Sequence, residues 1–359
     1  MIRVGSSELH GIAQESAKYP PANVVYREAQ PSKSLISKMI KSPAKGVLNY
    51  FEQSNFEYIE APLFPVRTPC NWIYTPADTA TAMAFNFLGL PTPRTLREYY
   101  LKYLFERDNF KALLFKSQAG LRTLEEYPTL ASDSVRSKAG VLYPAIREHQ
   151  EINRDGRHDI NIIFVGEFFR KGGIHVINAF EELQKEVSNI KLVICADIKK
   201  HFNHHLRPKF LNRIKINSAI SLNFVSRDTL FSEILPSGDI FISPTYNESF
   251  GYALLEAMAM GLPVISTNIF AIPEIVEDKK SGILIDIKDQ SFIKSQKGYS
   301  VENIPEDFIN YMDVEVTNAL RRLIIDRELR LEMGHIGRSI ARREFSFEKR
   351  NMALAGIYN

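Results

Sequence analysis

The chain has 359 residues, of which 45% are hydrophobic and 24% are charged, and its net charge is +3. This length and composition fit a globular protein of two domains, and the charge is too small to indicate a nucleic-acid-binding protein. The two cysteines, Cys70 and Cys195, belong to no paired motif, which argues against a disulfide framework or a cysteine metal site and favours a reducing compartment.

The first half of the chain predicts a small, irregular α/β domain. Short apolar segments predict strands at 1–7, 22–26, 56–63, 71–76, 111–117 and 139–144. Helical periodicity predicts helices at 95–107 and 119–127. The N-terminus lacks the apolar run of a signal peptide, and the longest nearly apolar stretch, 79–90, is too short and too polar to span a bilayer.

The second half alternates strands and helices more clearly. Continuous apolar runs predict strands at 160–166, 190–196, 239–245 and 263–267. Helices are predicted at 173–187, 227–237 and 251–260, and the segment 327–358 has a mostly helical pattern. Strands that alternate with helices through short links predict a parallel, doubly wound sheet.

The charged stretch 147–159 separates these two patterns and has no apolar periodicity of its own. We therefore predict an N-terminal domain over 1–152 and a C-terminal domain over 153–344. The final helix, 345–359, is expected to return to the N-terminal domain.

The segment 245–260 places two carboxylates around the start of a predicted helix. The preceding strand ends at the carboxyl edge of its sheet, where ligands bind in doubly wound folds. The helix opens near Gly251, and unpaired backbone N–H groups at such a start favour a phosphate. Glu256, further along the helix, could accept hydrogen bonds from ribose hydroxyls, and Glu248, in the loop, could face a sugar hydroxyl. The alternative interpretation is a helix-start acid at Glu248 and a solvated surface acid at Glu256.

A phosphate beside two carboxylates also needs cations, and the loop in 164–173 supplies them. It carries Arg170 and Lys171 between a predicted strand and a predicted helix. Arginine offers a planar fork to phosphate oxygens, and lysine offers a point charge. The loop has neither a Walker pattern nor the dinucleotide GxGxxG pattern, and the alternative interpretation is a basic surface turn.

Residues 161–358 resemble the C-terminal domain of the GT-B retaining glycosyltransferases of family four. The order and spacing of the segments 164–180, 223–267, 272–286 and 327–358 carry this resemblance. It implies a GT-B fold, in which two Rossmann-like domains with parallel sheets face each other across a cleft. In this fold the domain over 1–152 would bind the acceptor, and the domain over 153–344 would bind the nucleotide-sugar donor. It also implies a reaction that requires no metal or other cofactor.

The resemblance implies roles for individual residues. Glu248 would contact the donor sugar near the reacting carbon, and Glu256 would hold the ribose. Arg170 and Lys171 would bind the pyrophosphate, and Val225 would offer backbone groups to the nucleotide base. The remaining implied donor-binding residues are Gly166, Ser249, Phe250, Gly251 and Tyr252.

Two departures from the family pattern stand out. Glu167 occupies the position after Gly166 where the family usually has an arginine, so either Arg170 or Lys171 would take the task of that arginine. In the N-terminal domain, no active-site histidine of the family is evident, and the corresponding segment has Tyr74, Thr75 and Asp78.

Two further signals are weaker. The segment 31–45 sets apolar residues among four lysines, and it could rest on an anionic membrane surface or form an ordinary surface helix. His201, His204 and His205 have a spacing that invites a metal interpretation, but no carboxylate or cysteine accompanies them, so we expect an exposed loop without metal.

The sequence thus predicts a cytoplasmic, hexosyltransferase-type enzyme that moves a sugar from a nucleotide diphosphate sugar to a glycan, a lipid-linked or another acceptor, with retention. Such reactions serve polysaccharide biosynthesis, and an enzyme with a lipid-linked acceptor could work at the inner face of a membrane. One alternative is a non-catalytic nucleotide-sugar-binding or scaffold subunit, and another is a GT-B epimerase or phosphorylase. The base, the sugar, the acceptor and the oligomeric state are left open.

Overall fold

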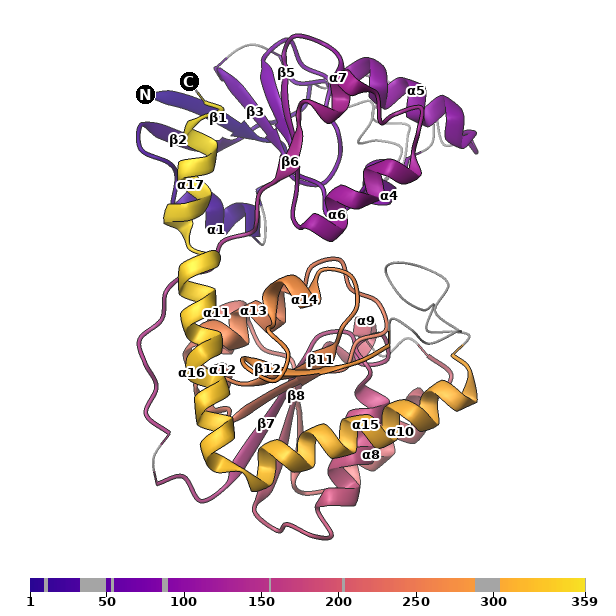
Figure 1. The fold of residues 1–359 in the computed structure, drawn as a ribbon, viewed down its shortest axis with the longest axis vertical. Coiled ribbons are helices and arrows are strands. Elements are labelled where there is room, and N and C mark those ends of the chain that lie inside the picture. The colour runs from indigo at the N-terminus through magenta and orange to yellow at the C-terminus, as the bar shows by residue number, and fades with distance from the viewer. Residues whose placement is uncertain are drawn as a thin grey trace. The chain divides into compact units, whose positions relative to one another are not determined.

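The computed structural model describes residues 1–9, 12–32, 50–52, 55–85, 90–154, 156–201, 204–287 and 304–358. Contacts divide the chain into unit 1, Met1–Ala145 with Phe345–Asn359, and unit 2, Ile146–Glu344 (Figure 1). This division falls a few residues before the boundary predicted after 152, and it places the last helix with the N-terminal segment. Whether each unit is an independent domain with the predicted role stays a prediction.

Unit 1 is built on a six-stranded sheet in the order β2-β1-β3-β4-β5-β6, and all its neighbouring strands are parallel. The strands are β1 (Ile2–Ser6), β2 (Val24–Glu28), β3 (Tyr58–Ala61), β4 (Asn71–Tyr74), β5 (Phe110–Phe115) and β6 (Ala139–Val141). Each lies within or overlaps one of the six strands predicted for this half, so the apolar runs there identified the sheet correctly.

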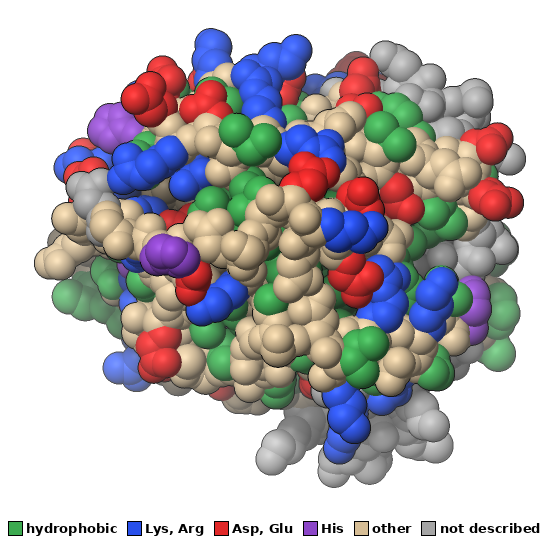
Figure 2. All heavy atoms as spheres, turned by 90° about the horizontal axis from the view of Figure 1, so that it is seen from below, with side chains coloured by type: hydrophobic (Ala, Val, Ile, Leu, Met, Phe, Trp, Pro, Cys, Tyr) green, Lys and Arg blue, Asp and Glu red, His purple; other side chains and the backbone are tan. Residues whose placement is uncertain are grey.

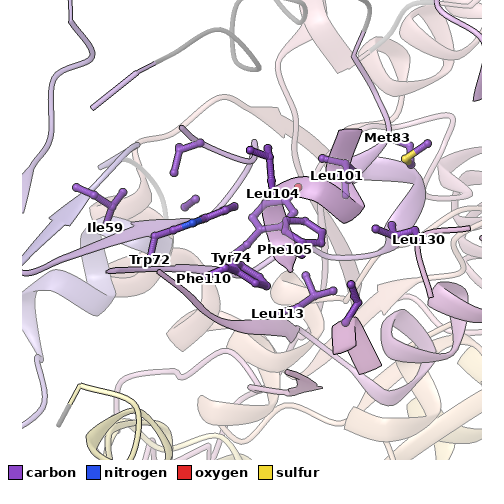
Figure 3. Close-up of a cluster of buried hydrophobic side chains, with 14 of the residues drawn as sticks. Ile59, Trp72, Tyr74, Met83, Leu101, Leu104, Phe105, Phe110, Leu113 and Leu130 are labelled. Atoms are coloured by element: carbon purple, nitrogen blue, oxygen red, sulfur yellow. The ribbon is translucent and has the colours of Figure 1, made fainter. Parts of the chain in front are cut away.

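Helices connect these strands. They are α1 (Ile12–Lys18), α4 (Thr79–Ala82), α5 (Arg94–Phe105), α6 (Gln118–Arg122) with the 3₁₀ turn η2 (Thr123–Glu126), α7 (Asp133–Arg136) and the C-terminal α17 (Phe347–Ala355). An aromatic core lies between α5 and the sheet (Figure 3). In it, the ring of Phe110 lies 4.5 Å from the rings of both Trp72 and Phe105, measured between centroids.

The C-terminal helix is tied to unit 1 by a buried polar cluster. Arg350, on α17, donates to Glu60 Oε1 on β3 over 3.1 Å. Glu60 Oε2 accepts hydrogen bonds from the hydroxyls of Tyr26 and Tyr358, at 2.7 and 3.0 Å. The Glu60 carboxylate therefore joins a segment near the N-terminus to the last residues of the chain.

Unit 2 contains a second six-stranded parallel sheet, in the order β12-β11-β10-β7-β8-β9. Its strands are β7 (Ile160–Val165), β8 (Ile190–Cys195), β9 (Ile220–Asn223), β10 (Ile240–Ser243), β11 (Val264–Thr267) and β12 (Gly282–Ile285). Four of them lie within predicted strands. The edge strands β9 and β12 were not predicted; both are partly exposed, whereas the equally short strands β10 and β11 are fully buried.

Helices surround this sheet. They are α8 (Gly173–Leu183), α9 (Ile198–His201), α10 (Arg207–Ile216), α11 (Arg227–Thr229), the π-helical turn η3 (Leu230–Ile234), α12 (Leu235–Ser237), α13 (Tyr252–Ala259), α14 (Ile272–Ile275), α15 (Glu306–Ile325) and α16 (Arg327–Glu344). The predicted helix 227–237 is thus one continuous stretch of α11, η3 and α12.

One local prediction was wrong in part. The segment around His201, His204 and His205 was expected to be an exposed loop, yet helices α9 and α10 occupy its two ends. The apolar signal of α10 begins only at Phe210 and Ile214, which are buried one turn apart, so the polar start of the helix gave no periodicity.

The surface mixes both signs of charge. Figure 2 shows one face, on which lysine and arginine side chains alternate with aspartate and glutamate, in keeping with the net charge of +3. Among the described residues, no helix combines the length and apolarity needed to cross a bilayer. The predicted membrane segment 31–45 lies, from residue 33 onward, outside the described residues.

Candidate functional site

The site lies where the strand order of the unit 2 sheet reverses. The chain goes from β7 to β8 and β9 on one side, and then crosses to β10, β11 and β12 on the other. In open α/β sheets, ligands bind at the carboxyl ends of the two strands that flank this reversal. Here those strands are β7 and β10, and the loops that follow them are 166–172 and 244–251.

The first loop is a tight turn that starts at Gly166 and leads into α8. Lys171 N–H donates to the Glu167 carbonyl over 2.9 Å, which folds the loop back on itself. At the end of the loop, Gly172 has a φ of +75°, and a Cβ there would lie 2.2 Å from the Pro244 carbonyl oxygen. Only glycine fits this position. Because Gly172 has no side chain, the start of α8 can pack directly against the loop that follows β10.

Hydrogen bonds join the two loops. The backbone N–H of Tyr246 donates to the Arg170 carbonyl over 3.1 Å, and the Thr245 hydroxyl lies 3.3 Å from the same oxygen. In return, Arg170 Nη1 donates to the Asn247 carbonyl over 3.4 Å. The backbone thus fixes the spacing between the basic residues of one loop and the glutamate of the other.

Lys171 and Glu248 form a buried ion pair at the junction of the two loops. Their side chains are only 12% and 9% exposed. Burial alone would raise the pKa of the Glu248 carboxyl, but the charge and hydrogen bond of Lys171 and the charge of Arg170 outweigh it, so the pKa lies below its usual value. Glu248 is therefore held as a carboxylate next to a cation, at the place where the sequence predicted a donor sugar.

Arg170 has a more open environment than Lys171. Its Nε donates to Glu167 Oε2 over 2.5 Å, and the two side chains are 35% and 45% exposed. Glu167, which replaces the usual arginine of the family, thus neutralises part of the charge of Arg170. The more buried cation, in direct contact with Glu248, is Lys171.

The start of α13 offers backbone groups beside this pair. Glu248 Oε1 accepts from the N–H groups of Ser249 and Phe250, at 3.0 and 3.4 Å. Gly251 is the N-cap of the helix with a φ of +110°, and Tyr252 is its first residue. Phe250 is fully buried, so its side chain packs in the core of unit 2 and does not line the site.

Glu256 is buried in α13 and has its own cation. Its Oε1 lies 2.5 Å from Arg227 Nη2, and its side chain is 6% exposed, against 38% for Arg227. The Arg227 guanidinium lies over the Phe231 ring at 4.9 Å, and His149 stacks on the same ring at 5.2 Å. The predicted surface-acid alternative for Glu256 is wrong, because the carboxylate is inside the protein.

Val225 lies between β9 and α11 and is half-buried. Ser226, next to it, caps α11 by accepting from the N–H of Thr229 over 3.1 Å. Val225 therefore directly precedes the turn that carries Arg227, the partner of Glu256.

Sequence reasoning overlooked three residues around these loops: Arg227, Tyr246 and His175. Arg227 pairs with Glu256, and the hydroxyl of Tyr246 hydrogen-bonds to His175 on α8. None of them belongs to a charged cluster in the sequence. The signal that could have pointed to Arg227 is its position just after a serine helix cap, on the segment already assigned to the base.

The histidine-rich segment was expected to hold no metal, and this stays a prediction. His204 stacks on Phe169 with ring centroids 4.4 Å apart, and its Nδ1 accepts from the Leu206 N–H over 3.2 Å. Within the described ranges, no group of three or more His, Cys, Asp or Glu side chains is arranged to hold a metal ion.

Comparison with solved structures shows the fold class. The chain is similar to Anabaena Alr3699/HepE in complex with UDP and glucose, with 13% identity, a TM-score of 0.63 and coverage of 99% of both chains. It is also similar to the pneumococcal O-GlcNAc transferase GtfA in complex with UDP and GlcNAc, with 14% identity, a TM-score of 0.57, and coverage of 80% of this chain and 56% of that one. Together with the two parallel six-stranded sheets, these likenesses define a GT-B fold, and the predicted fold class is confirmed.

The sequence family follows from unit 2. Residues 146–297 match the family described as Glycosyl transferases group 1. The predicted resemblance is confirmed at this level for residues 146–297.

Curated relatives match mainly over part of their length. D-inositol 3-phosphate glycosyltransferase of Corynebacterium jeikeium is 34% identical over 122 residues, which cover 34% of this chain and 23% of the relative. The capsular polysaccharide biosynthesis glycosyltransferase CapM of Staphylococcus aureus is 24% identical over 197 residues, which cover 55% of this chain and 45% of CapM. The chain thus spans less than half the length of these two relatives.

Proposed function

We propose that the protein is a glycosyltransferase that moves a sugar from a nucleotide diphosphate sugar to a hydroxyl of an acceptor. The observation that carries this proposal is the buried Lys171–Glu248 pair at the carboxyl edge of a group 1 sheet, with the buried carboxylate of Glu256 in the helix that follows. A donor needs these three groups: a cation for the pyrophosphate, and carboxylates for the hydroxyls of the sugar and of the ribose.

The arrangement supports an electrostatic role in breaking the bond between the sugar and the phosphate. As this bond breaks, negative charge grows on the leaving pyrophosphate and positive charge grows on the sugar ring. Lys171, Arg170 and the first N–H groups of α13 would stabilise the pyrophosphate. Glu248 would accept a hydrogen bond from a sugar hydroxyl and favour the positive ring. In this proposal the protein supplies the cations, and no metal is assigned a role.

We propose retention at the anomeric carbon, with the acceptor attacking from the face that the pyrophosphate leaves. The acceptor hydroxyl would pass its proton to the departing phosphate oxygen while its own oxygen bonds to the sugar carbon. Two points support this proposal. Arg170 and Lys171 lie in the loop that follows β7, where they would face the leaving group, and the resemblance to family four implies retention.

The acceptor is proposed to be a glycan or a lipid-linked carbohydrate, reached from the cytoplasm. CapM is named for capsular polysaccharide biosynthesis, which supports an acceptor of this class. The non-catalytic alternative is not favoured, because residues 146–297 match a glycosyltransferase family and the two curated relatives are named as glycosyltransferases.

Binding of nucleotides gives the first test. The protein is heated with UDP, GDP or ADP and with the sugar derivatives of each. A nucleotide at 100 times its dissociation constant adds about 2.7 kcal/mol to the free energy of unfolding and raises the melting temperature. UDP is the first choice, because the solved structures named above contain it. Release of the nucleoside diphosphate from the donor, with mixed glycan acceptors, then tests transfer. Binding without any turnover would support the non-catalytic alternative.

A further inference from the structure

A hydrogen-bonded chain of three polar side chains runs from Asp313 on α15 through α8 to the loop that follows β10, and the Asp313 side chain at its far end is 30% exposed. The Tyr246 hydroxyl hydrogen-bonds to Nε2 of His175, and Nδ1 of His175 hydrogen-bonds to Asp313 on α15. His175 is fully buried and Tyr246 is 1% exposed. Buried polar groups of this kind are costly unless they are paired, so the three side chains constrain one another.

The proton positions in this chain follow from its chemistry. Burial and the charge of Asp313 hold the pKa of the Tyr246 phenol well above its usual value, so the phenol keeps its proton and donates it. Nε2 of His175 must then accept, and Nδ1–H donates to the Asp313 carboxylate. Only this tautomer satisfies all the partners, which gives the chain of hydrogen bonds a single direction.

Asp313 is itself fixed by a second set of contacts. Asn178 Nδ2 donates to both its carboxylate oxygens, at 3.1 and 3.0 Å. The side-chain oxygen of Asn178, Oδ1, accepts a hydrogen bond from Arg213 Nη1 over 2.9 Å. Arg213 is in turn paired with Glu181 at 2.7 Å. The carboxylate that orients His175 is therefore anchored to α8 and α10, and it is a firm end point for the chain.

At its other end, this chain of hydrogen bonds meets the two loops of the site. The Tyr246 phenol is held by His175, while the Tyr246 backbone N–H donates to the carbonyl of Arg170. Tyr246 lies two residues before Glu248, and Arg170 directly precedes Lys171. The same residue thus contacts both the loop of the glutamate and the loop of the lysine.

We propose that Tyr246 is a positioning residue of the donor site, which acts through His175 and Asp313 to hold Glu248 and Lys171 at the spacing that sugar transfer requires. This inference rests on the proposed function, and it adds a specific consequence. The base and the ribose would be held by Val225 and Glu256, which the Tyr246 hydroxyl does not position, so the loss of this hydroxyl should lower turnover more than nucleotide affinity.

Four variants test the proposal. Tyr246→Phe removes only the hydroxyl, and His175→Leu removes both hydrogen bonds of the imidazole. His175→Gln keeps a side-chain amide that can still pair with the phenol. The control is Tyr311→Phe, because the Tyr311 hydroxyl on α15 donates to the Asp286 carbonyl over 2.7 Å and has no contact with Tyr246 or His175 among the described bonds.

The kinetic measurement is turnover of the UDP-sugar that wild type uses, with the dissociation constant of UDP from calorimetric titration. We expect turnover to fall about tenfold in Tyr246→Phe and in His175→Leu. The double variant of Tyr246→Phe with His175→Leu should also be only about tenfold slower than wild type, because both changes break the same chain of hydrogen bonds. Affinity for UDP should stay within about twofold, His175→Gln should recover part of the rate, and Tyr311→Phe should behave as wild type. Additive losses, or unchanged turnover in Tyr246→Phe, would overturn the proposal.

A second measurement does not depend on catalysis. Amide hydrogen exchange of the peptide 244–252, read by mass spectrometry, should become faster in Tyr246→Phe and His175→Leu than in wild type and Tyr311→Phe. Equal exchange in all four proteins would overturn the inference. Failure of the proposed function itself would be visible in wild type alone, as absence of UDP binding or of turnover, and so the two failures are distinguishable.

Discussion

Two buried glutamates in this protein are held in opposite ways. In unit 1, Glu60 is satisfied by Tyr26 on β2 and by Arg350 and Tyr358 from the C-terminal segment. In unit 2, Glu248 is satisfied by Lys171 and by backbone N–H groups of its own loop. Both glutamate side chains are 9% exposed, so burial alone does not distinguish them.

The difference lies in how easily each cation could take another partner. Arg350 is itself buried between Glu60 and the tyrosines, and any movement of it would pull α17 from the sheet. Lys171 is a flexible side chain at the end of a turn, and its ammonium can rotate to a new anion while its backbone stays in place. We therefore interpret the Glu60 cluster as a structural clamp and the Lys171–Glu248 pair as a site that is ready for a phosphate.

The clamp gives the largest expected effect. Arg350→Ala leaves the buried Glu60 carboxylate without its cation and should lower the free energy of unfolding by about 3–5 kcal/mol. Denaturant unfolding measures this loss. Arg343→Ala is the control, since Arg343 pairs with Glu344 at the surface and its loss should change the free energy of unfolding far less than the loss of Arg350. UDP affinity of the folded Arg350 variant should be unchanged, and a specific loss of affinity would break the distinction between the two glutamates.

The two cations of unit 2 come next. Lys171→Ala should lower turnover by roughly a hundredfold or more, because it removes the buried charge proposed to face the leaving pyrophosphate. Arg170→Ala should have a smaller effect, because Arg170 is more exposed and already paired with Glu167. Steady-state rates of the two variants decide between them. Near-wild-type rates in both would show that this loop is not the phosphate site.

Glu248→Gln sharpens the comparison by keeping the shape and removing the charge. We expect turnover to fall about a hundredfold, while the donor dissociation constant rises no more than about threefold, the pattern of an interaction made mainly in the transition state. Both constants are measured on the same variant. Equal losses in both would make Glu248 a binding residue, and no loss in either would leave it as the acid that caps the start of α13.

A smaller effect is expected at Glu256, the other buried glutamate of the candidate site. Glu256→Ala should weaken donor binding by about 1–3 kcal/mol, because the ribose hydroxyls lose their acceptor. Calorimetric titration with UDP measures this change. The control is Glu277→Ala, since Glu277 is exposed and paired only with Lys280 at the surface. Unchanged affinity in Glu256→Ala would mean that the carboxylate serves Arg227 alone.

The smallest effect concerns pH. The pKa of Glu248 is lower in the folded protein than its usual value of 4.5, so the ionised pair adds stability above the unfolded pKa, and this contribution is lost as pH falls through the folded pKa. The difference in melting temperature between wild type and Glu248→Gln should therefore be constant near neutral pH and shrink below about pH 4.5. A difference that grows on acidification would contradict the assigned direction.

Much of the framework was determined by local sequence. The strands β7 and β10 were predictable because uninterrupted apolar runs suit a strand covered on both faces. The turn at Gly172 and the opening of α13 at Gly251 were predictable as well, since both loops carry glycine between a strand and a helix. The amino-acid sequence alone therefore sufficed to identify Lys171, Glu248 and Glu256 as candidate residues.

The partners of those residues were decided only by the tertiary structure. Lys171 and Glu248 are 77 positions apart, Glu60 and Arg350 are 290 apart, and His175 and Asp313 are 138 apart. No periodicity within one helix or strand relates such distant positions, because they meet only after the strands have taken their order in the sheets. A buried carboxylate also looks like a surface one in the sequence, since burial is a property of the neighbours that cover it.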